Sequence, residues 1–257
     1  MYVAFARAVS SHEPELSRAC QDPFAERIVP RPWSSLLRVA RRAPNPARRF
    51  RELRWLSLGL VDHLALRTGL IDRALKRALG GGIKQVVLLG AGLYTRAHRI
   101  SELHDVTFFE VDHPSTQGLK TRKAAGLPIA ARELRYAACD FARVSLDDAL
   151  LAQGFAPHEP SVWIWEGVTM YLEESAVDAS IARIAALSAP GSVLIATYLS
   201  PKTIASGSVV GQVGLAALAV ISEPVRMQST PKEMAIKLAP RGFEVALDAL
   251  PADVASE

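Results

Sequence analysis

From residue 83 onward, short apolar runs alternate with segments of helical period, and this alternation constrains the fold of the 257-residue chain more than any other feature. The apolar runs predict buried strands, because strands covered on both faces read as continuous hydrophobic stretches. We place them at 83–89, 106–111, 134–138, 161–165, 192–198 and 243–247. Helical spacing falls at 93–103, 116–125, 146–153, 173–188 and 231–239. We therefore predict an α/β fold with a doubly wound, mostly parallel sheet.

The first 80 residues have a different pattern, which predicts helices packed on the sheet domain. Apolar residues recur at helical spacing between 53 and 79, and three glycines then give a helix stop. We divide the chain into an N-terminal helical segment, 1–80, and a Rossmann-like domain, 81–257. A Gly-, Ala- and Val-rich insertion at 201–230 follows a strand's carboxyl end, where ligands bind in open α/β sheets. A lid over the substrate pocket is our preferred interpretation, and a homodimer interface is the alternative.

Composition excludes several classes of protein. With 49% hydrophobic residues the chain is not mainly disordered, and two cysteines are too few for a disulfide framework or a zinc cluster. The longest apolar run, 209–221, is shorter than the roughly 20 residues that a bilayer span needs, and no segment reads as a signal peptide. We therefore expect a cytoplasmic protein with no membrane partner.

Charge is unevenly distributed, and the stretch 41–54 is the most arginine-rich part. Between Arg27 and Arg77, thirteen Lys and Arg residues accompany three acids, although the net charge of the chain is only +4. Such a stretch can bind nucleic acid or anionic lipid. Prolines interrupt it, however, and aromatic residues are not interleaved with the charges as in a single-strand binder. We expect a solvated helical surface and no nucleic-acid partner, with recognition of an acidic substrate as the remaining alternative.

The sharpest local feature is VVLLGAGLYTRAHRI, in which an apolar strand runs into Gly90-Ala91-Gly92 and then a helix. Glycines let the backbone turn tightly and approach a ligand, and a helix N-terminus offers free N–H groups. Asp112 follows Gly92 by twenty residues, which is the offset of an acid that binds ribose hydroxyls. This loop and Asp112 therefore predict a site for a ribose-containing ligand.

Two further candidates follow the next two strands. Asp140-Phe141 comes after the third strand, where the carboxylate could accept from an adenine amino group and the ring could line its face. Glu166 follows the fourth strand. Because the carboxyl ends of parallel strands meet at one edge of the sheet, these carboxylates and Asp112 should converge there. Several carboxylates suit a ligand that carries a ribose and a cation, and they repel a polyphosphate.

S-adenosylmethionine fits this set of side chains. Its own carboxylate needs a cationic partner, for which Arg67 and Arg7 are the candidates. A nicotinamide dinucleotide fits less well, because Thr95, with bulky Tyr94 before it, stands where its loop needs a small residue. The sequence contains no G-x-x-x-x-G-K-[ST], no G-x-S-x-G and no metal-ligand spacing, so we expect no phosphate loop, hydrolase triad or metal site.

The chain resembles the leucine carboxyl methyltransferase family, and more closely a bacterial branch of S-adenosylmethionine-dependent O-methyltransferases, some of which act on polyketide-type natural products. The resemblance runs from about residue 4 to the end of the chain. It rests on the order and spacing of FARAVSSHEPELSRACQDPFAERIVP, LRTGLIDRAL, VVLLGAGLYTRAHRI, FFEVDHPSTQGLK, CDF, WIWEGVTMYL, PGSVLIATY and EPVRMQSTPKEMAIKLAPRGFEV. It implies a class I methyltransferase fold with S-adenosyl-L-methionine as the cofactor.

The resemblance also implies a role for each candidate residue. The implied cofactor-binding residues are Arg7, Arg67, Gly90, Ala91, Gly92, Asp112, Asp140, Phe141 and Glu166. Glu166 is implied to lie near the methionine end of the cofactor, and Tyr171 to line the acceptor side, so these two are the catalytic candidates. The implied reaction is methyl transfer to a carboxylate or hydroxyl of a small polyketide-like or aromatic acceptor. A non-catalytic cofactor-binding module and methylation of a protein's C-terminal carboxylate are the alternatives.

Two departures from the family pattern matter. The family loop usually reads GAGLDTR, and here Tyr94 replaces the Asp, so a carboxylate is lost beside the cofactor. The family fold usually has seven strands and only six can be placed, so either the seventh is absent or the chain is truncated. No histidine falls in a recognisable catalytic arrangement, which favours a carboxylate acceptor, because a carboxylate is ionised at pH 7 and needs no general base.

Overall fold

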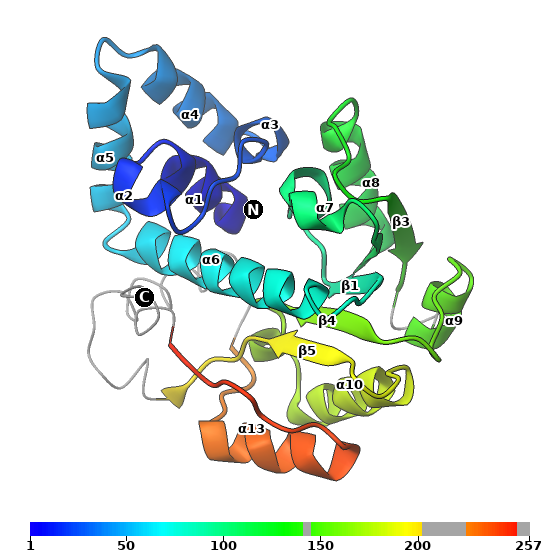
Figure 1. Ribbon diagram of the computed structural model, residues 1–257. Coiled ribbons are helices and arrows are strands. Elements are labelled where there is room, and N and C mark those ends of the chain that lie inside the picture. Colours follow the sequence, from blue (N-terminus) through cyan, green and yellow to red (C-terminus); the bar gives the residue numbers. More distant parts are fainter. Residues whose placement is uncertain (141–144, 202–224, 251–257) are drawn as a thin grey trace.

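The computed structural model describes residues 1–140, 145–201 and 225–250, which form a parallel sheet flanked by helices (Figure 1). The strands are β1 (Gln85–Leu89), β2 (Thr107–Asp112), β3 (Glu133–Ala138), β4 (Ser161–Trp165) and β5 (Val193–Ala196). They lie in the order β3-β2-β1-β4-β5, and every neighbouring pair is parallel. The chain therefore reverses its direction of travel across the sheet between β1 and β4, which is where ligands bind in doubly wound folds. The predicted α/β class is confirmed.

Helices cover both faces of the sheet (Figure 1). On one face lie α6 (Leu60–Leu79), α7 (Arg96–Arg99) and α8 (Pro114–Ala124). The other face carries α9 (Leu146–Leu151), α10 (Glu174–Ala186) and α13 (Pro231–Leu238). Side chains alternate along each strand, so β4 sends Val162 and Ile164 toward α6 and α7, and Trp163 and Trp165 toward α9 and α10. Burial on both faces explains why the strands read as continuous apolar runs.

Five further helices pack beside the sheet. They are α1 (Tyr2–Ser11), α2 (Pro14–Ser17), α3 (Ala25–Ile28), α4 (Trp33–Arg42) and α5 (Pro46–Leu56). They share an apolar cluster with the first half of α6, through Val61 and Leu64. The second half of α6 packs on the sheet through Ile71 and Leu75. One helix thus connects the N-terminal helices to the sheet, while the division of the chain at residue 80 stays a prediction.

Two predicted elements differ from the structure. The strand expected at 243–247 is wrong, because residues 244–247 are exposed and pair with no described strand. Apolar residues such as Leu247 gave a strand-like pattern without the neighbour that a strand needs. The helix expected at 93–103 is only α7, followed by a 3-10 turn at Ser101–Leu103, because Ile100 adopts an extended conformation that interrupts the helix.

The predicted lid, 201–230, falls mostly on residues 202–224, which lie outside the described residues. Its last part, 225–230, forms neither helix nor strand and lies beside the segments that follow β4 and β5. Arg226 N donates to Met170 O at 2.8 Å, and Ser229 N donates to Leu199 O at 3.0 Å. The role of this insertion as a lid or as an interface stays a prediction.

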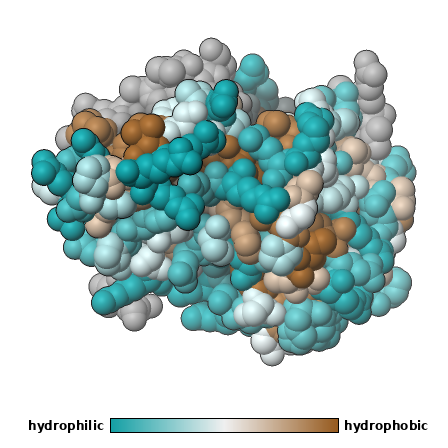
Figure 2. Space-filling view, turned by 90° about the horizontal axis from the view of Figure 1, so that it is seen from above, coloured by the Kyte–Doolittle hydropathy of each residue, from teal (hydrophilic) through white to brown (hydrophobic). Residues whose placement is uncertain are grey.

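The surface seen from above is mostly hydrophilic, with separate apolar patches (Figure 2). Within the three described ranges, no helix is both long and apolar enough to cross a bilayer.

Gly69 brings α6 against the segment that follows α2, and this contact can be tested. A Cβ built at Gly69 would lie 2.1 Å from the carbonyl oxygen of Ala19. We expect Gly69→Ala to lower the free energy of unfolding by about 1–3 kcal/mol, as overpacking does, although alanine favours a helix more than glycine. The measurement is chemical denaturation. Gly118→Ala in α8 is the control, because its Cβ would meet only flexible Arg122 at 3.5 Å. Equal effects of the two substitutions would contradict the close approach.

Candidate active site

The glycine loop after β1 is bonded to the end of β2. Gly90 N and Ala91 N both donate to Val111 O, at 2.9 and 3.0 Å, and Gly92 N donates to Asp112 Oδ2 at 2.5 Å. Gly90 and Gly92 have φ values of +66° and +46°, in the left-handed region that glycine adopts without a steric penalty. The structure therefore brings together the predicted loop and the predicted ribose-binding acid, which are twenty residues apart in sequence.

Asp112 is held in place by two backbone donors. While Oδ2 accepts from Gly92, Oδ1 accepts from His113 N at 2.7 Å. The residue is partly exposed at the carboxyl end of β2. The carboxylate is thus fixed in orientation and remains open to a ligand.

A buried ion-pair network lies next to this loop, and Glu166 at the end of β4 joins two of its arginines. Glu166 Oε1 accepts from Arg67 Nε at 3.0 Å, and Glu166 Oε2 lies 2.8 Å from Arg96 Nη2. Arg96 Nε donates to Asp72 Oδ1 at 2.7 Å. The network therefore connects β4 with α6, which carries Arg67 and Asp72, and with α7, which begins at Arg96.

These contacts keep Glu166 ionised. Burial raises the pKa of its carboxyl, but the positive charges of Arg96 and Arg67 outweigh burial and lower the pKa to about 2. A carboxylate with so low a pKa is a poor proton acceptor at neutral pH. The position of Glu166 therefore favours holding arginine side chains over acid–base chemistry.

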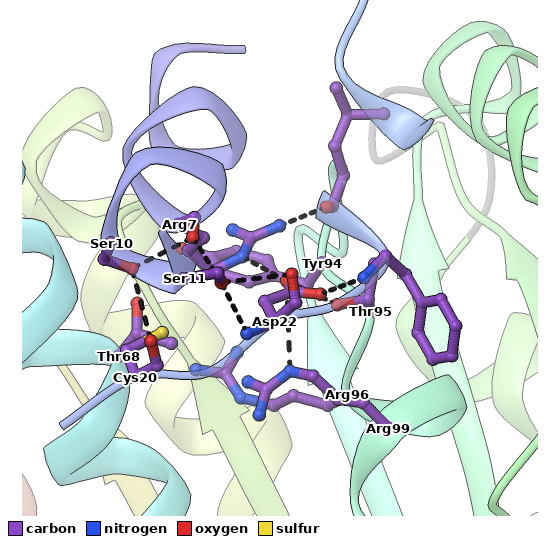
Figure 3. A network of polar contacts seen from close by, with 12 residues as sticks. Arg7, Ser10, Ser11, Cys20, Asp22, Thr68, Tyr94, Thr95, Arg96 and Arg99 are labelled. Carbon is purple, nitrogen blue, oxygen red and sulfur yellow. Dashed lines mark hydrogen bonds and ion pairs between the residues drawn. The ribbon is translucent and has the colours of Figure 1, made fainter. Parts of the chain in front are cut away.

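A second branch of the network centres on Asp22 and ties α1 to the glycine loop (Figure 3). Asp22 Oδ2 accepts from Arg7 Nε at 2.8 Å and from Thr95 Oγ1 at 2.6 Å, and Arg99 Nε lies 3.9 Å away. Arg7 Nη2 also donates to Leu93 O at 2.5 Å. Burial raises the pKa of Asp22, but Arg7, Arg99 and the Thr95 hydrogen bond together hold it below its ordinary value.

Tyr94 occupies the centre of the network. The guanidinium groups of Arg7 and Arg96 both lie over its ring, with their central carbons 4.6 and 4.7 Å from the ring centroid. Its hydroxyl accepts from Arg67 Nη2 at 3.2 Å. Burial raises the pKa of this phenol well above its ordinary value, so Tyr94 is neutral. The substitution that departs from the family pattern is therefore a packed, hydrogen-bonded part of the structure.

The charges of this network do not cancel. Its members are four arginines and three acids, together with neutral Tyr94: Arg7, Arg67, Arg96, Arg99, Asp22, Asp72 and Glu166. One positive charge is in excess. Arg96 Nη1 is also buried without a hydrogen-bond partner among the described residues. Both observations suit a ligand that brings a carboxylate.

The structure places the other candidates less closely together. Asp140 lies two residues after β3 and is partly exposed, and Tyr171 ends the 3-10 turn Thr169–Tyr171 after β4. Phe141 lies outside the described residues. Gly167, next to Glu166, lies close to Arg67, because a Cβ there would be 3.7 Å from Arg67 Nη2.

Several network residues were missed by sequence reasoning. Asp72 and Arg96 lie beside apolar residues of their helices, and Asp22 lies within a motif of the resemblance to which no role was given. For Asp72, the surrounding apolar residues of α6 were an available signal of burial. A second buried ion pair joins β2 to α8, where Lys120 Nζ lies 2.6 Å from Glu110 Oε2. Burial raises the pKa of the Glu110 carboxyl and lowers the pKa of the Lys120 amine.

Comparison with known proteins establishes the family. A family model described as leucine carboxyl methyltransferase matches residues 1–185. The chain belongs to the leucine carboxyl methyltransferase family. The resemblance to this family that the sequence motifs indicated is thereby confirmed for residues 1–185.

Two bacterial proteins are similar in sequence to more than half of this chain. A protein of Mycobacteroides abscessus, named as a candidate S-adenosyl-L-methionine-dependent methyltransferase, is 35% identical over 197 residues, which cover 75% of this chain and 64% of that protein. A similarly named protein of Frankia alni is 38% identical over 157 residues, which cover 59% of this chain and 51% of that protein. The matched regions thus span 51–64% of these two relatives' own length.

Solved structures show the same fold. A DUF574 family protein from Streptomyces avermitilis has a TM-score of 0.54 at 18% identity, with 79% of this chain and 80% of that chain covered. A candidate methyltransferase from Thermobifida fusca has the same TM-score and identity, with 90% of this chain and 78% of that chain covered. At this identity the likeness concerns the fold alone.

The buried carboxylate of Glu166 makes a prediction about pH. Its pKa is lowered from about 4.5 to about 2, so its ion pairs stabilise the folded chain above pH 4 and are lost as pH falls toward 2. We expect Glu166→Gln to lower the free energy of unfolding at pH 7 by about 3–5 kcal/mol, because it leaves buried arginines without their partner. The acid-induced loss of stability between pH 4 and 2 should also become shallower.

The measurement is urea denaturation from pH 2 to 8. The control is Glu159→Gln at an exposed position, which should change stability by less than about 0.5 kcal/mol at every pH. If Glu166→Gln and the control behave alike, Glu166 does not carry a buried ion pair.

Proposed function

We propose that this chain is an S-adenosyl-L-methionine-dependent methyltransferase that methylates an oxygen of a small molecule, a carboxylate in preference to a hydroxyl. The observation that carries the proposal is the hydrogen bond from Gly92 N to Asp112 Oδ2, which joins a glycine loop to an open carboxylate at the carboxyl ends of the strands. The family and the names of the bacterial relatives support it. Aromatic and polyketide-like acids are the acceptors we propose first.

The described residues fit this cofactor. In our proposal Gly90, Ala91 and Gly92 let the cofactor approach the backbone, and Asp112 accepts from the ribose hydroxyls. Asp140 is proposed to hold the adenine, together with Phe141, which lies outside the described residues.

The methionine end is proposed to lie by the arginine network. The excess positive charge there and the unpartnered Arg96 Nη1 suit the methionine carboxylate, with Arg67 and Arg7 as its proposed partners. The methionine carboxylate would offset this excess positive charge, while the ammonium and sulfonium of the cofactor keep charges of their own.

The bound cofactor supplies a methyl group on a sulfonium, which is a good leaving group. The contribution of the chain is to orient the reactants and exclude water, since opposite charges combine into neutral products more readily in a dry site. Glu166 acts in this proposal by orienting Arg67, because its lowered pKa makes it a poor base. Tyr171 is proposed to line the acceptor side.

The first test is calorimetric titration with S-adenosylmethionine and, in parallel, S-adenosylhomocysteine. Binding of both is expected, and no binding of either would overturn the proposal.

The ribose role of Asp112 is tested by substitution. Asp112→Asn should weaken cofactor binding about 10- to 100-fold, because paired ribose hydrogen bonds are worth on the order of 1–3 kcal/mol. Asp105→Asn, an exposed position paired with Lys84, is the control and should leave affinity unchanged. Unchanged affinity in Asp112→Asn would refute the ribose role.

The acceptor preference needs a separate measurement. Methyl transfer is followed with an aromatic acid and with the phenol that lacks its carboxyl group. The acid should be methylated at a rate that is nearly constant from pH 6 to 8, because a carboxylate with an ordinary pKa near 4 is already ionised. Preferential methylation of the phenol, with a rate that rises with pH, would show that the acceptor is a hydroxyl.

A further inference from the structure

The hairpin of α4 and α5 carries a concentration of positive charge that the candidate active site does not use. Residues 27–51 include eight arginines and no Asp or Glu. Six of these arginines lie on the two helices, and all six are exposed: Arg38, Arg41, Arg42, Arg48, Arg49 and Arg51. Such a surface attracts anionic groups.

Large apolar side chains are exposed on the same hairpin. Val39 is 69% exposed and Leu56 is 78% exposed, and Leu36 is exposed beside them. Together with Leu53 and Ala43 they line a groove of about 640 Å³ between the two helices. Figure 2 shows apolar atoms set among hydrophilic ones on the side of the molecule where α4 and α5 lie. The groove has the volume of a site for one small ligand, which is typically about 300–1,000 Å³.

A polar pocket adjoins this groove. It has a volume of about 370 Å³ and is lined by Glu26, Arg38, Arg41 and Arg42. Arg38 and Arg42 line the groove as well, so the apolar and the cationic parts are continuous. Arg41 lies 3.5 Å from Glu26, whereas Arg38 and Arg42 form no ion pair with any described residue. The guanidinium groups of Arg38 and Arg42 are therefore available to an anionic group where the apolar groove meets the polar pocket.

We propose that this hairpin is a binding site for an anionic amphiphile. The apolar chain of the ligand lies in the groove, on Leu36 and Val39 of α4 and on Leu53 and Leu56 of α5. Its carboxylate or phosphate head accepts charge-assisted hydrogen bonds from Arg38 and Arg42. A polyanion without an apolar part would leave the leucines uncovered, and an uncharged apolar ligand would leave the guanidinium groups unpaired.

The site is separate from the candidate active site, with α1 between them. Phe5 of α1 packs on Trp33 of α4 with ring centroids 4.8 Å apart, and His12 at the end of α1 stacks on Phe50 of α5 at 4.1 Å. Arg7 of the same helix contacts the glycine loop instead. The proposal therefore does not depend on the chemistry proposed for that loop.

The test uses dodecanoate below its critical micelle concentration, with the full chain in a calorimeter. Saturable binding of one dodecanoate per chain is expected. Dodecyltrimethylammonium has the same chain with a cationic head, and acetate has the head without the chain. Both should bind at least tenfold more weakly, and equal binding of the cation would overturn the proposal.

Matched variants locate the site. The double substitution Arg38→Glu and Arg42→Glu, and separately Leu56→Asn, should each weaken dodecanoate binding at least tenfold. All three side chains are exposed, so the thermal midpoint should be retained. Arg132→Glu at an exposed position beside the sheet is the control and should bind as the unaltered chain does. Unchanged binding in the double variant would overturn the assignment.

Co-sedimentation with vesicles of phosphatidylglycerol or phosphatidylcholine distinguishes a free amphiphile from a lipid of a membrane surface as the ligand. Binding of monomeric dodecanoate without enrichment on either vesicle supports a free ligand. Binding of the monomer together with enrichment on phosphatidylglycerol supports the same site filled from a lipid surface. Enrichment on vesicles with no binding of the monomer would overturn the proposal of a single-ligand site.

Discussion

The pairing of Glu166 with Arg67 and Arg96 is the interaction on which the arrangement around the glycine loop depends. A buried guanidinium without a partner costs several kcal/mol, so each arginine of the network needs a carboxylate close by. Glu166, at the end of β4, is the partner of two of these arginines: its Oε1 lies 3.0 Å from Arg67 Nε and its Oε2 lies 2.8 Å from Arg96 Nη2. The demand for charge compensation therefore fixes how α6, α7 and β4 meet, and with them the position of the loop between β1 and α7.

Features that are local in the sequence were predictable, and features set by packing were not. The strand β1, its glycine loop and Asp112 could be read from apolar runs and a short spacing, because each pattern reflects a nearby backbone constraint. The partners of Arg96 could not be predicted from the sequence, because Asp72 and Glu166 come close to Arg96 only after α6 and β4 have packed. The expected strand at 243–247 failed for a related reason, since an apolar pattern does not show whether a neighbouring strand is present to pair with it.

Tyr94 contributes packing to the glycine loop without contributing a charge. The family pattern has Asp at this position, and that charge would make the network neutral overall. The phenol instead offers its ring faces to Arg7 and Arg96, a contact worth on the order of 2 kcal/mol for desolvated groups. The network of this chain thus keeps one positive charge in excess, which favours a ligand group that carries a carboxylate.

The long sequence separations within the network have a consequence for how the chain is made. Arg67 and Glu166 are 99 residues apart, so at about 5–20 residues per second the ribosome completes Arg67 roughly 5–20 s before its partner appears. During that interval the N-terminal helices can gather around their own apolar cluster, and Arg7 of α1 already has its partner Asp22. Arg67 of α6 keeps its hydration instead, because its carboxylate partner appears only when the end of β4 has been synthesised.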